Sequence, residues 1–192
     1  MNNRILALGV LALAAAPLAF SQSSTWKLDP AHSEVDFVCK HMALSNVRGR
    51  FGIKEGTIVL NEADITKSTV TVTIDVSTVD TGVSYRDNDL KSDHYFDTGK
   101  FPTATFTSTS VSGSAGHLTV NGNITIHGVT KPITLDVEGP SGPAPGMGGK
   151  LHAGYSATTS LKRKDFGVGA GTPDGVVSDD IKLTLDIDAA KQ

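Results

Sequence analysis

Apolar and polar side chains alternate over several stretches of this chain, the pattern of strands with one buried face. From Val70 to Val76 every second residue is valine or isoleucine, and threonine or aspartate lies between them. Threonine fills many of the polar positions, because β-branched residues suit a pleated surface. The pattern predicts an all-β antiparallel protein with strands near residues 26–29, 33–41, 50–60, 69–79, 103–112, 117–126, 132–138, 151–162 and 180–188.

Two stretches interrupt the alternation. Residues 84–91 lack it, and Ser84 followed by Asp87 resembles a capping box, so we expect about two helical turns that end before Phe101. Residues 139–149 are rich in glycine and proline and predict a flexible loop between two strands. Asn121-Gly122 and His127-Gly128 predict turns.

Many short antiparallel strands fit either a closed barrel or a two-sheet sandwich. A barrel of about eight strands is just wide enough to hold its own side chains or one slim ligand. A sandwich buries its two inner faces against each other and has no lumen. Periodicity alone leaves both architectures open.

The N-terminal segment has the composition of a secretory signal peptide. Arg4 precedes an apolar run over residues 5–16, and Ala19 and Ser21 offer small side chains at a cleavage site. The apolar run is short for a membrane anchor, which needs about 20 apolar residues. We therefore expect residues 1–21 to be removed on export and residues 22–192 to form a single mature domain.

Charge and cysteine content exclude several classes of protein. The chain has 17 basic and 20 acidic side chains and a formal charge of −3. This balance argues against nucleic-acid binding, which needs a strongly basic surface. Its one cysteine, Cys39, cannot form an intramolecular disulfide. Cys39 and His41 lie two residues apart and could ligate a metal, but structural zinc takes four ligands and no second such pair exists. We expect no metal site and no cofactor.

Several segments, taken in order along the chain, resemble the YceI-like family. They are WKLD at 26–29, VRGRF at 47–51, DVSTVDTG at 75–82, YFDTGKFP at 95–102, TIHGVTK at 125–131 and RKDFG at 163–167. The resemblance implies a lipocalin-like closed antiparallel β-barrel of about eight strands with a short helical insertion. It also implies a periplasmic protein that carries a long isoprenoid lipid, such as a polyprenol or an isoprenoid quinone, in an apolar lumen.

The ligand-binding residues that we expect on this basis are mostly apolar. They are Val35, Phe37, His41, Phe51, Ile53, Val72, Ile74, Leu90, Phe96, Phe106, Leu135, Leu161, Phe166 and Ile187. His41 shares a strand face with Cys39, and we expect this face to point inward. We therefore expect His41 to contact the polar head of the lipid or a water beside it. The alternative is that the same apolar side chains fill a solid core.

Charged residues recur in the family-like segments, notably Arg86, Asp87, Asp97, Arg163 and Asp165. Paired carboxylates can perform acid–base chemistry, which requires pKa values that are pushed apart. We instead expect Arg–Asp pairs to hold the helix and the loop near residue 166 onto the barrel.

Three functional classes follow. The first is an exported, non-catalytic protein that binds an isoprenoid lipid for transport or storage, and transient contact with a membrane and homodimerisation are open. The second is an enzyme that modifies a lipid in the same cavity. The third, a membrane-embedded barrel, fails because the outward strand positions hold Thr, Asp, Lys and Glu where a lipid-facing apolar band is required.

Overall fold

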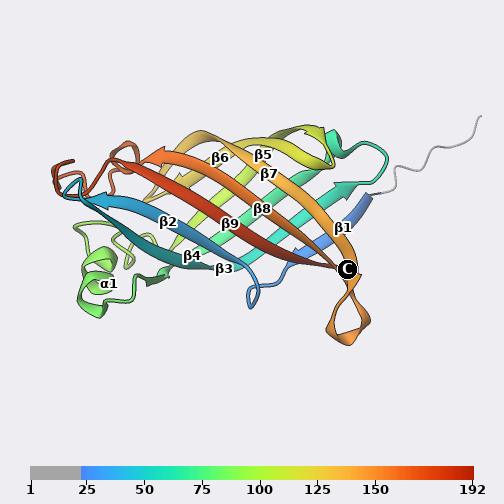
Figure 1. Ribbon diagram of the computed structural model, residues 1–192, viewed down its shortest axis with the longest axis horizontal. Helices are drawn as coiled ribbons and strands as arrows, with labels where there is room; N and C mark the ends of the chain where they lie inside the picture. The colour runs from blue at the N-terminus through green and yellow to red at the C-terminus, as the bar shows by residue number, and fades with distance from the viewer. Residues whose placement is uncertain (1–22) are drawn as a thin grey trace, which may run out of the picture.

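The computed structural model of the chain describes residues 23–192, so the predicted signal peptide at residues 1–21 lies outside the described residues (Figure 1). Within residues 23–192, nine strands are accompanied by a single α-helix, α1 (Ser84–Lys91), and by three short 3₁₀ helices, η1 (Ile65–Lys67), η2 (Met147–Gly149) and η3 (Arg163–Phe166). The strands are β1 (Ser23–Leu28), β2 (Glu34–His41), β3 (Ser45–Asn61), β4 (Thr69–Asp80), β5 (Thr103–Ser114), β6 (Gly116–Ile126), β7 (Val129–Pro145), β8 (Leu151–Lys162) and β9 (Asp180–Lys191). Over the same range no helix is both long enough and apolar enough to cross a bilayer.

Eight of the strands close into an antiparallel barrel. Neighbours follow the order β3-β2-β9-β8-β7-β6-β5-β4, and a further pairing of β3 with β4 closes the ring. That closing pair places Ile53 opposite Ile74 and Ile58 opposite Val70. The closed barrel is therefore confirmed, and the sandwich alternative is wrong.

The ninth strand, β1, lies in the same stretch of wall as β2. It pairs with one end of β3, over residues 57–61, and with one end of β9, over residues 189–191. β2 pairs with the other end of β3 and with residues 182–186 of β9. The two strands thus follow one another between β3 and β9, and residues 29–33 connect them (Figure 1).

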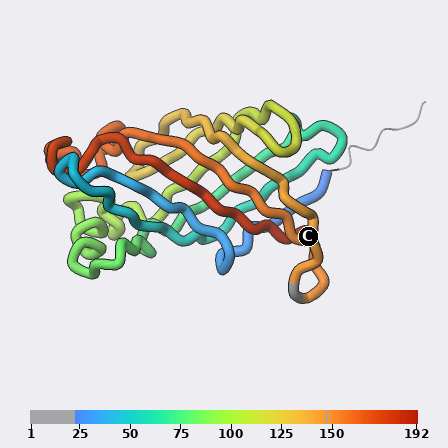
Figure 2. The backbone as a smooth tube through the Cα atoms, in the orientation of Figure 1, coloured from blue at the N-terminus to red at the C-terminus, as the bar shows by residue number. Residues whose placement is uncertain are grey.

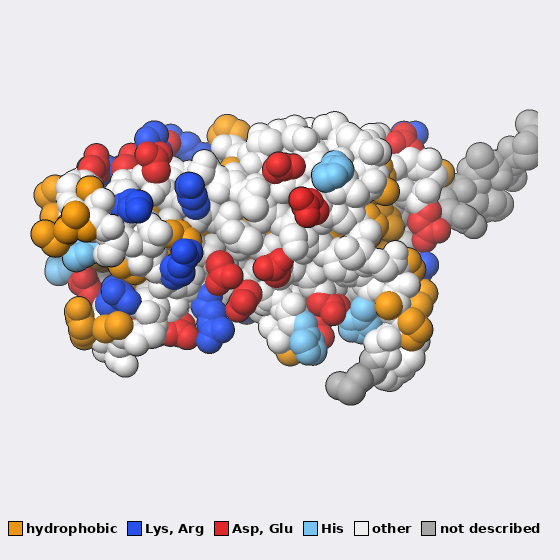
Figure 3. Space-filling view, viewed as in Figure 1, with side chains coloured by type: hydrophobic (Ala, Val, Ile, Leu, Met, Phe, Trp, Pro, Cys, Tyr) orange, Lys and Arg blue, Asp and Glu red, His pale blue; other side chains and the backbone are white. Residues whose placement is uncertain are grey.

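The predicted alternation describes the two faces of the wall. Val72, Ile74 and Val76 of β4 are buried, and the residues between them are more exposed. Inward positions of the other strands join them in one core cluster. On the side of the molecule that Figure 3 shows, few hydrophobic side chains lie on the outer face of the wall.

One predicted turn is present and the other is wrong. His127 and Gly128 connect β6 to β7 with positive φ angles of 51° and 76°. Asn121 and Gly122 instead lie inside β6. Gly122 is needed there because the ring of Phe106 on β5 lies across it: a Cβ at Gly122 would come within 2.4 Å of two ring carbons.

The loop predicted over residues 139–149 is shorter than expected. β7 continues to Pro145 and still pairs with β8, with Ser141 opposite Gly154. Register shifts occur on both sides of Ser141, and Gly139 and Gly142 adopt positive φ angles there. Glycine and proline thus mark an irregular strand rather than a loop, and the hairpin tip projects past the barrel near the C-terminus (Figure 2).

The predicted helix is present, but the capping box is wrong. Val83 is the N-cap residue and provides no side-chain hydrogen bond. The Asp87 carboxylate instead accepts hydrogen bonds from the N–H and hydroxyl of Thr81, at 2.9 and 2.6 Å. Arg86 donates to the hydroxyl and carbonyl oxygens of the same Thr81. Arg86 and Asp87 therefore fasten α1 to the end of β4 through Thr81 and not as an ion pair, while Asp97 pairs with Lys100 at 2.8 Å.

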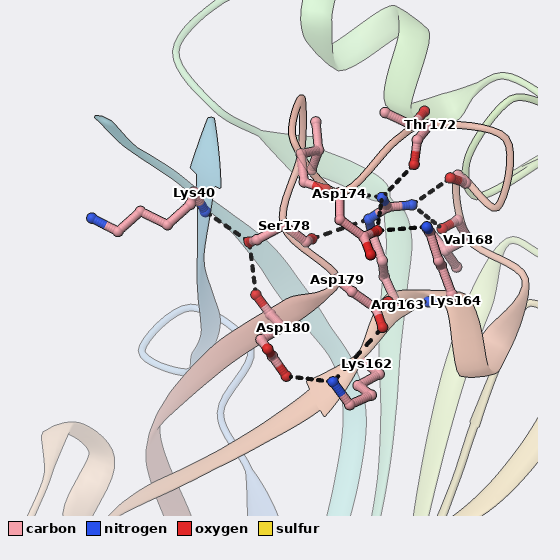
Figure 4. Close-up of polar contacts among 12 residues, drawn as sticks. Lys40, Lys162, Arg163, Lys164, Val168, Thr172, Asp174, Ser178, Asp179 and Asp180 are labelled. Atoms are coloured by element: carbon pink, nitrogen blue, oxygen red, sulfur yellow. Dashed lines mark hydrogen bonds and ion pairs between the residues drawn. The ribbon is translucent and has the colours of Figure 1, made fainter. Parts of the chain in front are cut away.

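A buried arginine organises the loop between β8 and β9 (Figure 4). Arg163 is only 4% exposed, and its guanidinium donates to backbone carbonyl oxygens of Val168, Gly169, Thr172, Val177 and Ser178. The expected pairing with Asp165 is wrong, because Asp165 is exposed and Asp174 lies 3.6 Å from the guanidinium. One side chain thus satisfies five carbonyls of a loop that covers one end of the barrel.

We expect Arg163→Met to lower the free energy of unfolding by about 3–5 kcal/mol, since it leaves buried carbonyl oxygens without donors. Arg50→Met is the matched control, because Arg50 is 58% exposed and its ion pairs with Glu34 and Asp80 lie at the surface. That control should lose less than about 1 kcal/mol. Urea denaturation of both variants measures the difference, and equal losses would contradict the role given to Arg163.

Candidate functional site

Within residues 23–192, two apolar cavities lie inside the barrel. Cavity 1, of about 110 Å³, is lined by Leu60 and Ile65 near η1 and by inward residues of most strands. Cavity 2, of about 120 Å³, lies toward α1 and the loop that Arg163 organises. Both are walled almost wholly by aliphatic and aromatic side chains.

The two cavities meet partway along the barrel. Four residues line both of them, one each from β2, β4, β6 and β9: Val35, Ile74, Ile124 and Leu183. Val35 and Leu183 lie on the neighbouring strands β2 and β9, and Ile74 and Ile124 lie on β4 and β6, which flank β5. We call these four residues between the cavities the collar. The cavities therefore lie end to end and form one lumen along the barrel.

Twelve of the fourteen residues expected to bind a ligand line this lumen. Those on cavity 1 are Val35, Val72, Ile74, Phe106, Leu135 and Ile187. Those on cavity 2 are Val35, Phe37, Phe51, Ile74, Leu90, Phe96, Leu161 and Phe166. The structure thus brings the apolar set together, and whether these residues contact a ligand stays a prediction.

Ile53 and His41 do not line either cavity. Ile53 is buried in the wall, at 5% exposed, away from both cavities. His41 is exposed, which corrects the expectation that it faces inward. It is the last residue of β2 and lies three residues beyond Val38, the last β2 residue paired with β9, so the barrel no longer encloses it.

Aromatic side chains close the cavity 2 end. The rings of Phe37 and Phe51 lie 5.3 Å apart, and Phe96 meets Phe51 edge-on at 5.4 Å. Phe96 belongs to the segment after α1, so this stack fastens that segment over the barrel mouth. Phe166 and Val177 of the Arg163-anchored loop complete the end wall.

Sequence reasoning missed most of the remaining lining residues. Val120 on β6 and Leu185 on β9 occupy the same alternating inward positions as the residues that it named, so periodicity could have found them. Tyr155 and Arg163 carry no such signal as lumen residues, because an aromatic or basic residue in a strand pattern does not reveal which way it points.

Few polar side chains reach the lumen. Those of cavity 1 are Ser68, Thr159 and Tyr155, and those of cavity 2 are Cys39, Tyr95 and Arg163. Burial raises the pKa of the Cys39 thiol and the pKa of the Tyr155 hydroxyl, so both stay protonated at neutral pH. Over residues 23–192, no group of three or more His, Cys, Asp or Glu side chains is placed to hold a metal ion.

The size and polarity of the lumen set what it can bind. A cavity of about 150 Å³ with apolar walls binds benzene, and each cavity here is somewhat smaller. Each therefore accepts a group about the size of one isoprene unit. A longer tail requires the lining side chains to move apart along the barrel.

Comparison with known proteins finds relatives that carry the name YceI among both sequences and solved structures. Protein YceI of Salmonella newport is 34% identical over 189 residues, which covers 95% of this chain and 97% of that protein. The crystal structure of a Campylobacter jejuni YCEI protein has a TM-score of 0.68 at 35% identity and covers 80% of this chain and 90% of that one.

A polyisoprenoid binding domain from Saccharophagus degradans, implicated in plant cell wall breakdown, has a TM-score of 0.64. Its identity is 19%, over 87% of this chain and 98% of that one, so it supports the fold alone. Residues 26–189 match the profile of the YceI-like domain. The profile covers nearly all of the barrel, and the chain belongs to the YceI-like domain family.

Proposed function

We propose that this protein binds a long isoprenoid lipid, a polyprenol or an isoprenoid quinone, in the lumen and transports or stores it in the periplasm. The observation that carries the proposal is the pair of cavities aligned end to end inside a closed barrel, with apolar walls. A domain described as polyisoprenoid binding has the same fold, and we propose the ligand class by analogy with it. The signal-peptide pattern at residues 1–21 supports export.

The energetics favour a hydrocarbon tail. Each CH₂ moved from water into an apolar lumen contributes about 0.8 kcal/mol. A tail that displaces Leu, Ile and Val side chains along the lumen keeps them in apolar surroundings. The free-energy cost of widening the cavities therefore comes mainly from repacking these side chains. The favourable free energy of binding grows with the length of the tail.

The lining of the lumen favours binding over catalysis on a lipid. Among the described residues that line cavity 1, Tyr155 is the one ionisable side chain, and burial keeps it protonated. In cavity 2 the Cys39 thiol has a raised pKa, which disfavours the nucleophilic thiolate. Arg163 is occupied by backbone carbonyls.

Transport requires contact with a membrane, and we place that contact at the turn between β2 and β3. Leu44 is 82% exposed at this turn, and Met42 is 56% exposed. Val176, which is 44% exposed, lies beside the turn, because its carbonyl oxygen accepts a hydrogen bond from the Met42 N–H. This apolar tip lies beside the end of the barrel that cavity 2 occupies.

Basic side chains surround the apolar tip. Lys40, Arg48 and Lys182 are exposed on adjacent strands near it, with Arg48 and Lys182 on either side of Val38. Figure 3 shows hydrophobic side chains at this end of the molecule, with both basic and acidic side chains close to them. Each such cation near an anionic lipid surface contributes about 1 kcal/mol, so the tip suits weak, reversible contact with anionic phospholipid.

The binding proposal predicts the effect of plugging the lumen. Ala157 lines cavity 1 and is 6% exposed, and a phenyl ring at this position would occupy most of that cavity. We expect wild-type protein purified from the periplasm to release a stoichiometric isoprenoid on organic extraction, measured by mass spectrometry. Ala157→Phe should release little.

Thr158→Phe is the control, because Thr158 is the next residue and lies on the exposed outer face. It should carry as much lipid as the wild type, and thermal melts check that both variants fold. A stable wild-type protein with no extractable lipid, or a folded Ala157→Phe protein with full lipid, would contradict the proposal.

The membrane contact predicts a local charge effect. Leu44→Glu places a carboxylate in the tip and should reduce co-flotation of the protein with phosphatidylglycerol vesicles at least severalfold, by lost apolar insertion and added repulsion. Leu151→Glu, at an exposed position near the opposite end of the barrel, should leave flotation unchanged. Equal flotation of the two variants would place the contact elsewhere.

A further inference from the structure

The Tyr155 hydroxyl is an unusual group in an otherwise apolar cavity. Its oxygen is buried and has no hydrogen-bond partner among the described residues. The rest of the residue is partly exposed, so the hydroxyl is the inward end of the side chain. Buried hydroxyls without a partner are rare because they forfeit the hydrogen bonds they make in water.

The other hydroxyl groups of the lumen are already engaged. In cavity 1 the Ser68 hydroxyl accepts a hydrogen bond from the Asn61 N–H at 3.0 Å, and the Thr159 hydroxyl donates to the Thr134 oxygen at 2.8 Å. In cavity 2 the Tyr95 hydroxyl lies 3.1 Å from the Thr172 hydroxyl. Tyr155 differs in having no protein partner to give up when a ligand arrives.

The irregular stretch of β7 provides the space for the Tyr155 ring. Gly139, with φ at +132°, lies directly against it: a Cβ there would be 3.0 Å from Tyr155 Cδ1 and 2.9 Å from the Gly154 oxygen. A glycine in a conformation that other residues rarely adopt thus seats the ring beside cavity 1.

We propose that the Tyr155 hydroxyl is the headgroup site of the lumen and donates a hydrogen bond to an uncharged oxygen, an alcohol or a carbonyl, of the bound isoprenoid. The head then lies in cavity 1 and the tail passes the collar into cavity 2. This inference rests on the proposed function, because it requires a lipid in the lumen.

The lining of cavity 1 selects an uncharged head. Over the described residues it contains no basic side chain, so a phosphate or pyrophosphate would be buried without a counter-charge. Burial raises the pKa of Tyr155 and keeps its hydroxyl a donor. Neighbouring side chains cover the hydroxyl oxygen while the cavity is narrow, so a lipid oxygen reaches it as the tail spreads the walls.

The test compares two lipids that differ in the head oxygen. Geranylgeraniol carries a hydroxyl and squalene is a pure isoprenoid hydrocarbon, and both can compete with an uncharged fluorescent hydrocarbon, diphenylhexatriene, in the lumen. Tyr155→Phe should weaken the binding of geranylgeraniol roughly five- to tenfold, which is the effect of one neutral hydrogen bond. The affinity for squalene should stay unchanged. Because the variant removes a group without a partner, its melting temperature should not fall.

Tyr95→Phe is the matched control, since its hydroxyl lines cavity 2 and already has a partner; it should leave the ratio of the two affinities as in the wild type. If neither lipid binds the wild type, the proposed function fails. If both bind and Tyr155→Phe leaves their affinity ratio unchanged, Tyr155 is not the headgroup site. Tighter binding of geranylgeranyl pyrophosphate than of geranylgeraniol would also overturn the inference.

Discussion

Closure of the sheet by the pairing of β3 with β4 is the constraint on which the rest of the structure depends. It leaves no free edge on the ring and fixes the number of strands, which in turn limits the width of the interior. Among the described residues, an interior of this width, lined by branched aliphatic side chains, leaves two narrow cavities. A slim, flexible hydrocarbon chain is the ligand shape that such an interior fits.

The cavity 2 end of the barrel is closed by an aromatic stack and by a loop. At the cavity 2 end, Phe96 packs on Phe51, and Arg163 holds its loop through backbone carbonyls. Hydrogen bonds donated by one buried cation give the part of that loop that follows η3 a defined shape. The exposed apolar tip with its basic neighbours lies at the same end, and under the membrane contact and headgroup site that we propose, a lipid would enter there with its head leading. A hydrogen-bond donor at Tyr155, beyond the collar, would then meet the head first.

Much of the lumen could be predicted from local pattern, and the exceptions have physical reasons. Alternation fixes which side of a strand a residue takes, so Ile74, Phe106 and Ile187 were identified correctly as inward. Alternation says nothing about where the wall ends, which is why His41 was misplaced. The position of a glycine in the sequence does not show its structural role either. Gly122 and Gly139 lie where an aromatic ring from a neighbouring strand approaches the backbone closely, and neither marks a turn or a loop.

The sequence by itself determined the strands, the single short helix, the apolar character of the inward face and the resemblance to the YceI-like family, because each depends on residues close together in the chain. Only the tertiary structure decided that the sheet closes, that residues from β2, β4, β6 and β9 form the collar, and that Asp174 rather than Asp165 lies against Arg163. The unpartnered Tyr155 hydroxyl also emerged only there. These features depend on strand register and on contacts between distant segments, and a periodic pattern contains no information about either.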